Sequence, residues 1–345
     1  MPPPRNPTLA DIAAASGYSK SAVCAALKGR RNVPLETRNK IVAAARELGY
    51  RADPQLSKLM SYLRNHKEMA APCNIAWIFC GGHHDYYTLP WSAGYLRGAR
   101  QRALDLGLTL DVIWLDAPDL ISRDITHMLV SRGVEGIIIA PPWSEHHETR
   151  VDWSLFTCVF LDQSLHPPHL HHVMTDYFKN MTLAMAKATE MGYRRPAYLS
   201  SDFMDLVSGG CYSAAFDFAQ LALPKKDRLP RFAVSREGWD ACAKWIAKNH
   251  PDVLIVDQND AIRELQARGF SVPSDMGLIH TNICSDVAEW SGIDQCHDVL
   301  GASAIEALFS HLIRGEKGPP AHIKSIEIAG RWHPGTTTCS PMAMK

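Results

Sequence analysis

Three histidine-rich segments carry side chains of the kind that bind metal ions. They are His83-His84-Asp85, His146-His147-Glu148 and His166-Pro-Pro-His169-Leu-His171-His172. A zinc site needs ligands that converge in space, and these residues are only adjacent along the chain. Pro167 and Pro168 indicate a loop. We therefore predict solvated loop histidines, with no metal site and no cofactor.

Motifs of the enzymes that use doubly wound folds are missing from the sequence. It contains no phosphate-binding P-loop, no G-x-G-x-x-G that opens a helix and no G-x-S-x-G nucleophile elbow. The sequence therefore predicts that the protein is not an enzyme.

Charge is distributed unevenly along the 345 residues, although the net charge is zero. Residues 1–67 contain 12 lysines and arginines against 4 aspartates and glutamates, which gives a net charge of +8. The remaining residues, with 24 basic and 32 acidic side chains, carry −8. A basic head on an acidic body is typical of a chain that binds a polyanion at one end.

Cysteine usage and hydropathy indicate a cytoplasmic protein. The nine cysteines form no Cys-x-x-Cys pair, and several lie in apolar runs, as buried thiols in a reducing compartment do. The start, MPPPRNPTLAD, lacks the apolar core of a secretion signal. No stretch approaches the roughly 18 apolar residues of a membrane span, so we expect no membrane partner.

Residues 8–49 predict three short helices. Thr8 and Ser19 are expected to cap the first and the second, because each hydroxyl precedes apolar residues at helical spacing. Pro34 opens the third helix and Gly49 closes it. Two short helices joined by a glycine-containing turn, with a third bracing them, predict a helix-turn-helix module.

From residue 74 onward, strand-like runs alternate with helical patterns. The first series has strands at 75–80, 110–115, 136–140, 158–162 and 173–176, and helices at 92–106 and 120–131. The second has strands at 197–200, 232–234, 253–257 and 277–280, and helices at 177–191, 211–221, 238–248 and 260–268. Two such series predict two doubly wound parallel sheets, with ligands bound beyond the carboxyl ends of the strands.

The head sequence TLADIAAASGYSKSAVCAALKGRRNVPLETRNKIVAAARELGYR resembles the lactose-repressor (LacI/GalR) family almost position for position. The body is similar in shorter motifs: GVEGIIIAPP, CVFLDQS, MTD before a helix, GYRRPAYLS, RGFSVPSDMGLI, and Gln295 with Leu300-Gly301. The resemblance covers about residues 8–338. It implies an N-terminal all-α helix-turn-helix domain, a hinge helix, and an α/β periplasmic-binding-protein-like core of two doubly wound parallel-sheet subdomains that forms a homodimer.

These patterns divide the chain into three parts. Residues 1–50 are the predicted DNA-binding domain, 51–72 the hinge helix or linker, and 73–345 the effector-binding and dimerisation core. Within the core we expect subdomains at 73–165 and 166–295, with the C-terminal segment crossing back.

By the resemblance, the helix at 19–27 lies in the major groove of duplex DNA. The family's base-reading positions fall on Lys20, Ser21 and Ala25. Lys20 is suited to donate to guanine, whereas many relatives carry arginine where this chain has Ala25, so we expect a different operator. The resemblance and the loop chemistry add these DNA-contacting candidates: Thr8, Leu9, Ser19, Lys28, Arg30, Asn32 and Thr37. The alternative for Lys20 and Ser21 is ordinary helix surface.

The linker contains Leu56, Leu59 and Leu63 at helical spacing. In the family, a hinge-helix leucine inserts into the minor groove, and that leucine falls on Leu59. Leu56 occupies a position where a small residue is usual. A linker helix that merely packs on the core is the alternative that these residues leave open.

The resemblance also implies an effector site built from loops that follow strands. Tyr86, Tyr87 and Trp91 offer aromatic faces to a sugar ring or a heterocycle, although each is also a candidate core residue. The family's arginine and late aspartate fall on Tyr212 and Asn282, so the two ionic anchors of sugar-binding relatives are lost. The remaining candidates are Asp162, Asp257, Asn259 and Gln295.

The sequence thus predicts a DNA-binding transcription regulator, a repressor by the resemblance. Its expected partners are a pseudo-palindromic double-stranded operator, a small effector such as a saccharide or related metabolite, and a second copy of the chain. Two alternatives stay open: a regulator whose core has lost effector binding, and a solute-binding protein, for which a basic head has no use.

Overall fold

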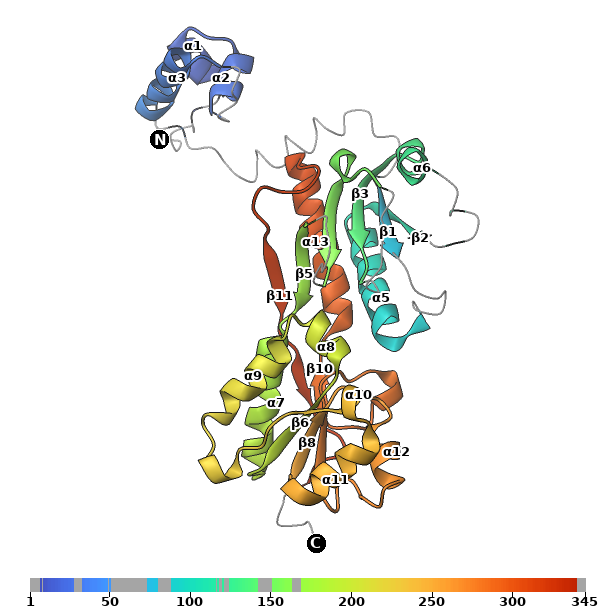
Figure 1. The fold of residues 1–345 in the computed structure, drawn as a ribbon. Helices are drawn as coiled ribbons and strands as arrows, with labels where there is room; N and C mark the ends of the chain where they lie inside the picture. The colour runs from blue at the N-terminus through green and yellow to red at the C-terminus, as the bar shows by residue number, and fades with distance from the viewer. Residues whose placement is uncertain are drawn as a thin grey trace. The chain divides into compact units, whose positions relative to one another are not determined.

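The structure, a computed structural model, describes residues 9–27, 33–48, 73–79, 88–115, 124–141, 151–162 and 169–339, with residues 7, 50, 117 and 120. Contacts divide the chain into two units, Met1–Glu68 and Met69–Lys345. This boundary falls inside the predicted linker. Figure 1 shows the helices and strands of the two units.

The N-terminal unit contains the three predicted helices, α1 (Leu9–Ser16), α2 (Lys20–Leu27) and α3 (Leu35–Glu47). They pack around a small core whose buried side chains come from all three helices: Ile12, Val23, Ala26, Ile41 and Ala45. The predicted cap of α2 is present, because the Ser19 hydroxyl accepts a hydrogen bond from the Ala22 N–H at 3.2 Å. The predicted helix-turn-helix arrangement is confirmed.

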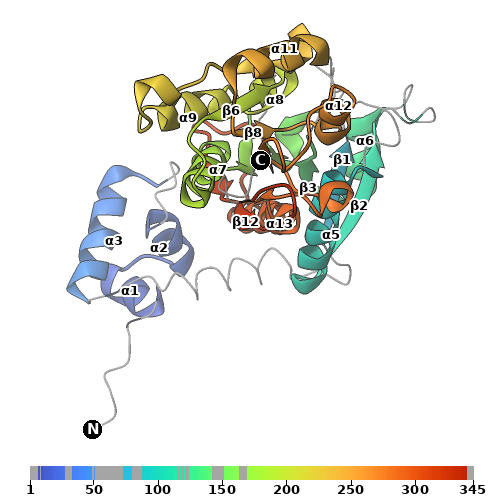
Figure 2. The same ribbon diagram turned by 90° about the horizontal axis from the view of Figure 1, so that it is seen from below.

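The first sheet of the body has the strand order β11-β5-β4-β3-β1-β2, and all its strand pairs are parallel. Its strands are β1 (Cys73–Phe79), β2 (Leu108–Trp114), β3 (Val134–Ile139), β4 (Thr157–Leu161), β5 (His171–Thr175) and β11 (Ser325–Ile328). Helices α5 (Pro90–Asp105) and α13 (His297–Arg314) cover one face, and α6 (Ile125–Ser131) lies on the other (Figure 2).

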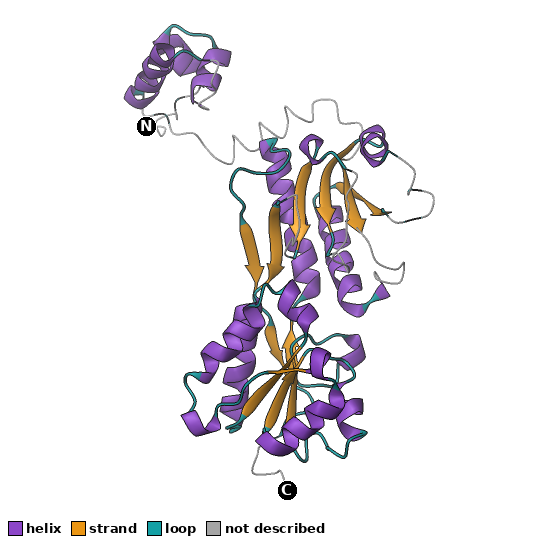
Figure 3. Cartoon of the chain, viewed as in Figure 1, coloured by secondary structure: helices purple, strands orange, loops and turns teal. Residues whose placement is uncertain are grey.

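The second sheet has the order β12-β10-β9-β8-β6-β7, in which only β12 is antiparallel to its neighbour. Its strands are β6 (Pro196–Ser200), β7 (Phe232–Ala233), β8 (Val253–Val256), β9 (Gly277–His280), β10 (Gly292–Asp294) and β12 (Arg331–His333). Helices α7 (Tyr177–Met191) and α9 (Cys211–Gln220) pack on one face. The opposite face packs against α11 (Trp239–Asn249) and α12 (Ala261–Gln266), as Figure 3 shows.

Both sheets share the strand order of a doubly wound fold, in which the second strand of each series lies outside the first. The predicted fold class is confirmed. The buried strands read as continuous apolar runs because helices cover both faces of each sheet.

The chain passes between the two sheets three times, after β5, after β10 and after β11. The predicted boundary at residue 165 is therefore displaced: β5 pairs with β4, so the first subdomain extends through Thr175. The first and third crossings are joined by backbone hydrogen bonding, since the Asp176 N–H donates to the Ile328 carbonyl at 3.0 Å.

Several elements were not predicted. They are α8 (Asp202–Val207), α10 (Val234–Glu237), α13, β10, β11 and β12. No helix among the residues described here has the length and apolarity that crossing a membrane requires.

Candidate DNA-binding and effector sites

A cleft of about 340 Å³ lies between the two subdomains of the body, at the carboxyl ends of their strands. Loops and helix starts that follow strands of both sheets form its walls. Aromatic, polar and acidic side chains make up much of the lining: Trp91, Tyr95, Asp162, Tyr177, Ser201, Asp257, Gln258, Asn259, His280, Thr281, Asn282, Cys284, Asp286 and Gln295. This is the place at which doubly wound folds bind ligands.

Asp162 directly follows β4 and is fixed in an uncommon conformation. Its φ of 72° lies in the left-handed region, which residues other than glycine seldom adopt. Its carboxylate is buried and accepts a hydrogen bond from the Tyr177 hydroxyl at 2.7 Å. Such conformations collect at functional sites, where surrounding contacts maintain them.

Asp257 follows β8 and faces the cleft from the second subdomain. Its carboxylate accepts hydrogen bonds from the Ser201 hydroxyl and the Gln258 amide. Burial raises the pKa of Asp257 to about 6. The carboxyl group is therefore mostly ionised at pH 7.5 and mostly protonated at pH 5.

His280, the last residue of β9, supplies an uncharged donor. Its Nδ1 accepts the Asn282 N–H at 3.1 Å, so the proton of the neutral ring is on Nε2. Burial lowers the pKa of His280 to about 4, so the ring stays neutral at physiological pH. The Nε2 atom is buried and has no hydrogen-bond partner among the described residues, and the same holds for the Thr281 hydroxyl next to it. Unpartnered buried polar atoms are costly, and a ligand with hydroxyl groups can satisfy them.

Gln295 lies at the second crossing between the subdomains and is 3% exposed. Its Nε2 donates to the Tyr212 hydroxyl and to the Thr281 carbonyl, both at 2.9 Å. Its Oε1 accepts from the Thr175 hydroxyl at 3.2 Å. One side chain thus links the end of β5 in the first subdomain to α9 and β9 in the second.

The effector residues predicted from the sequence fall into three groups. Trp91, Asp162, Asp257, Asn259, Asn282 and Gln295 line the cleft. Tyr212 is fully buried behind this lining and contacts Gln295. Tyr86 and Tyr87 lie outside the described residues.

Sequence reasoning missed several lining residues that bear on the chemistry of the cleft, among them Tyr95, Tyr177, His280 and Asp286. Two of them had a usable signal, since His280 ends β9 and Tyr177 starts the helix after β5. Tyr95 had none, because it lies inside α5, at a spacing typical of an ordinary core residue.

In the head, Ser19 and Lys20 at the start of α2 are exposed, whereas Ala25 and Thr37 are half-buried. Leu9 and Ser21 lie in α1 and α2. Thr8, Lys28, Arg30, Asn32, Leu56 and Leu59 lie outside the described residues, so the loop and hinge predictions stay predictions.

The end of the third histidine-rich segment differs from the prediction of a solvated loop, while its residues 166–168 lie outside the described part of the chain. His171 and His172 are half-buried in β5, where pairing with β4 and β11 positions them. The His171 ring stacks on His311, with centroids 4.2 Å apart and planes 13° apart, and Glu316 accepts a hydrogen bond from His311. One ligand atom from each of His171, His311 and Glu316 lies within 4.8 Å of the other two, so these three side chains could together hold a metal ion.

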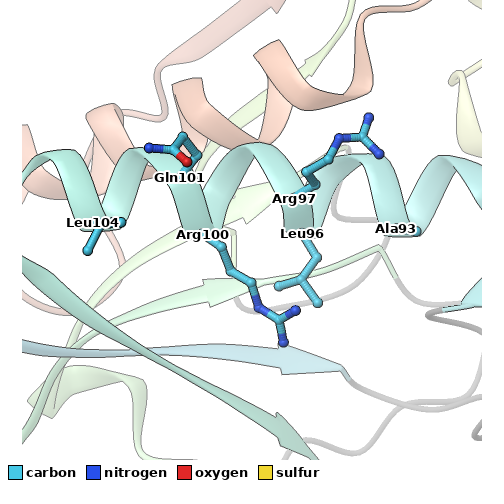
Figure 4. A pocket seen from close by; sticks show the side chains of 6 residues that line it. All are labelled: Ala93, Leu96, Arg97, Arg100, Gln101 and Leu104. Carbon is cyan, nitrogen blue, oxygen red and sulfur yellow. The ribbon is translucent and has the colours of Figure 1, made fainter.

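A shallow hollow of about 500 Å³ lies along one face of α5. Its six lining side chains all come from this helix, with Arg97 and Arg100 pointing away from each other (Figure 4). Leu104, at the end of this face, is 71% exposed.

Known proteins resemble this chain in the sequence of its head and in the fold of its body. Residues 8–53 match the sequence model of a family described as "Bacterial regulatory proteins, lacI family". No curated protein matches the chain by sequence.

Solved structures resemble the whole chain. A "transcriptional regulator CelR-cellobiose complex" has a TM-score of 0.58 at 18% identity, covering 96% of this chain and 100% of its own. A lac repressor dimer bound to operator and the anti-inducer ONPF has a TM-score of 0.56 at 18% identity, covering 97% and 100%. The regulator CcpA of Lactococcus lactis has a TM-score of 0.56 at 16% identity, covering 78% and 100%. At these identities the likeness is one of fold.

The match of residues 8–53 and the shared fold lead to the same assignment. The N-terminal helix-turn-helix domain, residues 8–53, matches the lacI family of bacterial regulatory proteins, and the body has the same fold as solved regulators of this kind.

Proposed function

We propose that this protein is a transcription repressor that binds a pseudo-palindromic operator as a homodimer and responds to a small effector, a saccharide or related metabolite. The observation that carries the proposal is the combination on one chain of a lacI-family head with a cleft that contains unpartnered buried polar atoms. The proposal gives the chain no catalytic activity. Because the proposed target of the protein is bacterial operator DNA, we also propose that the protein is cytoplasmic.

The head supports major-groove binding through α2. Its first residue, Lys20, and the preceding Ser19 are exposed, and its buried residues Val23 and Ala26 pack against α1 and α3. A recognition helix contacts base edges with its N-terminal residues, which is where Lys20 lies. A lysine there is suited to donate to guanine O6 and N7.

Lys20→Ala is expected to reduce discrimination at one base pair of each half-site by about 10- to 100-fold, because one specific base contact is worth about 1–3 kcal/mol. Binding to the selected operator and to duplexes substituted at each position measures this by fluorescence anisotropy. Lys40→Ala is the matched control: it removes the same charge from an exposed site on α3, and should weaken all sequences alike. Equal weakening by Lys20→Ala would refute base reading by this residue.

The body supports effector binding at the cleft. Asp162, Asp257 and Asn282 offer polar atoms, and the Trp91 and Tyr95 rings, 5.7 Å apart, offer apolar surface beside them. This combination suits a ring with hydroxyl groups. The neighbour solved with cellobiose is consistent with a sugar.

Trp91→Ala is expected to weaken binding of the effector at least about tenfold, because an aromatic contact surface in the cleft is lost. Isothermal titration calorimetry with the saccharide found by thermal-shift screening measures the change. Phe218→Ala truncates a 60%-exposed aromatic outside the cleft lining and should leave the affinity unchanged. An unchanged affinity in the Trp91 variant, with its fold intact, excludes Trp91 as an effector contact.

The face of α5 that carries the hollow supports the homodimer. It combines the hollow along this helix with the exposed Leu104, and Val112 on the edge strand β2 is 40% exposed. Exposed apolar surface of this kind marks subunit contacts. Sedimentation equilibrium of the purified chain, compared with a Leu104→Glu variant, tests the assignment.

A further inference from the structure

We propose that the cleft takes an uncharged or positively charged polyhydroxylated ligand and rejects phosphorylated and carboxylated ones. The inference rests on the proposed effector role of the cleft and specifies the chemical class of its ligand. It follows from the charges that line the cleft and from the uncharged groups that accompany them.

The lining is acidic. Asp162, Asp257 and Asp286 contribute three carboxyl groups, and none of the lining residues that the structure describes is a lysine or an arginine. An anionic ligand would thus bring like charges together in a partly desolvated space, which is strongly unfavourable.

The hydrogen-bond donors to these carboxylates described here are uncharged. The Tyr177 hydroxyl donates to Asp162 at 2.7 Å, the Ser201 hydroxyl to Asp257, and the Asn259 amide to Asp286 at 2.5 Å. Such donors orient the carboxylates without neutralising them. The carboxylates of Asp257 and Asp286 therefore remain available to a ligand, as acceptors for hydroxyl groups or as partners for an ammonium group.

Hydroxyl groups match the remainder of the lining. The carboxylates only accept hydrogen bonds, while His280 offers an unpartnered Nε2–H and Thr281 an unpartnered hydroxyl. A ligand hydroxyl both donates and accepts, so a polyhydroxylated molecule satisfies both kinds of group. A fully ionised phosphate group has only acceptor oxygens, so it offers the aspartates no hydrogen-bond donor.

The first test does not require the effector to be known, because the half-buried Cys284 lines the cleft. A methanethiosulfonate transfers its thioalkyl group to a thiolate and releases a sulfinate. The full chain is treated at pH 7.5 with the cationic trimethylammonium-ethyl reagent or the anionic sulfonatoethyl reagent, and modification is followed by peptide mass spectrometry. Burial raises the pKa of Cys284 to about 12, which slows both reactions alike and leaves their ratio informative.

The ratio of cationic to anionic rates at Cys284 should exceed the ratio at Cys339, a half-buried thiol outside the cleft lining, by about tenfold or more. Asn282→Lys places a cation in the lining and should abolish the difference. Equal ratios at the two thiols in the chain without the substitution would overturn the proposal. Faster modification of Cys284 by the anionic reagent than by the cationic one would also overturn it.

The second test uses matched ligands. Glucose, galactose and mannose are titrated alongside their 6-phosphates, their uronic acids and their 2-amino derivatives. For any scaffold that binds, the phosphate and the uronic acid should bind about 100-fold more weakly than the parent, and the amino sugar at least as tightly. Tighter binding of an anionic member overturns the charge inference while leaving effector control intact. If no scaffold binds, the thiol ratio alone decides the charge inference, and the saccharide part of the proposed function fails separately.

Discussion

Raising the salt concentration from about 50 to about 200 mM is expected to weaken binding of the full chain to duplex DNA by about a thousandfold. Each basic side chain that neutralises a phosphate releases condensed counterions, and a protein with about 6–10 such contacts loses at least that much affinity over this range. Residues 1–67 carry 12 lysines and arginines against 4 acidic residues, enough for a dimer to make these contacts. Fluorescence anisotropy at five salt concentrations gives the slope.

The control for this experiment is a measurement of folding at each salt concentration. Circular dichroism and thermal unfolding in the same buffers show whether the head stays folded as the salt concentration changes. A slope near zero, with the chain folded throughout, would contradict the assignment of the basic head as a DNA-binding surface.

Gln295→Leu is expected to lower the free energy of unfolding of the body by about 3 kcal/mol. The substitution removes the acceptor of the Thr175 hydroxyl, the donor to the Tyr212 hydroxyl and one donor to the Thr281 carbonyl, and all three residues are buried. Each buried polar group left without a partner costs about 1–3 kcal/mol. Urea unfolding followed by tryptophan fluorescence measures the loss.

Gln258→Leu makes a suitable comparison, because Gln258 lines the same cleft and is only half-buried. We expect it to cost less than about 1 kcal/mol, since water can replace the lost partners. If both variants were equally stable, the network at the second crossing would not be a major contribution to the stability of the body.

The sequence was most informative where local signals and burial agree. Ser19 both precedes an apolar helical pattern and caps α2, so the start of that helix could be predicted. The apolar runs of β1, β3 and β8 are strands covered on both faces. The strand β11 was missed because it has only four residues, largely exposed, so the alternation of Ile326 and Ile328 is too short to predict a strand.

The sequence of the long helix α13 contains an apolar pattern typical of a helix. Leu300, Ala304, Ile305 and Leu308 are buried at helical spacing, on the face that packs against the first sheet. Its membership of the first subdomain could not be predicted, because it follows strands of the second sheet along the chain.

The sequence predicted where the cleft lies better than it predicted which residues line it. Asp162 and Asp257 directly follow strands, and parallel strands bring their carboxyl ends to one edge. Tyr212 was expected to contact the ligand, whereas the structure places it between Tyr177 and Tyr198, behind the lining. The unpartnered Nε2–H of His280 depends on tertiary burial and on a backbone contact two residues away, and neither is visible in the sequence.

Selection of duplexes from a random pool by the full-length protein tests the central claim most directly. At low ionic strength the account predicts enrichment of sequences with two inverted half-sites, and loss of preference at one position of each half-site when Lys20 is replaced by alanine. Retention of no duplex at any salt concentration, or retention of all sequences equally, would contradict it.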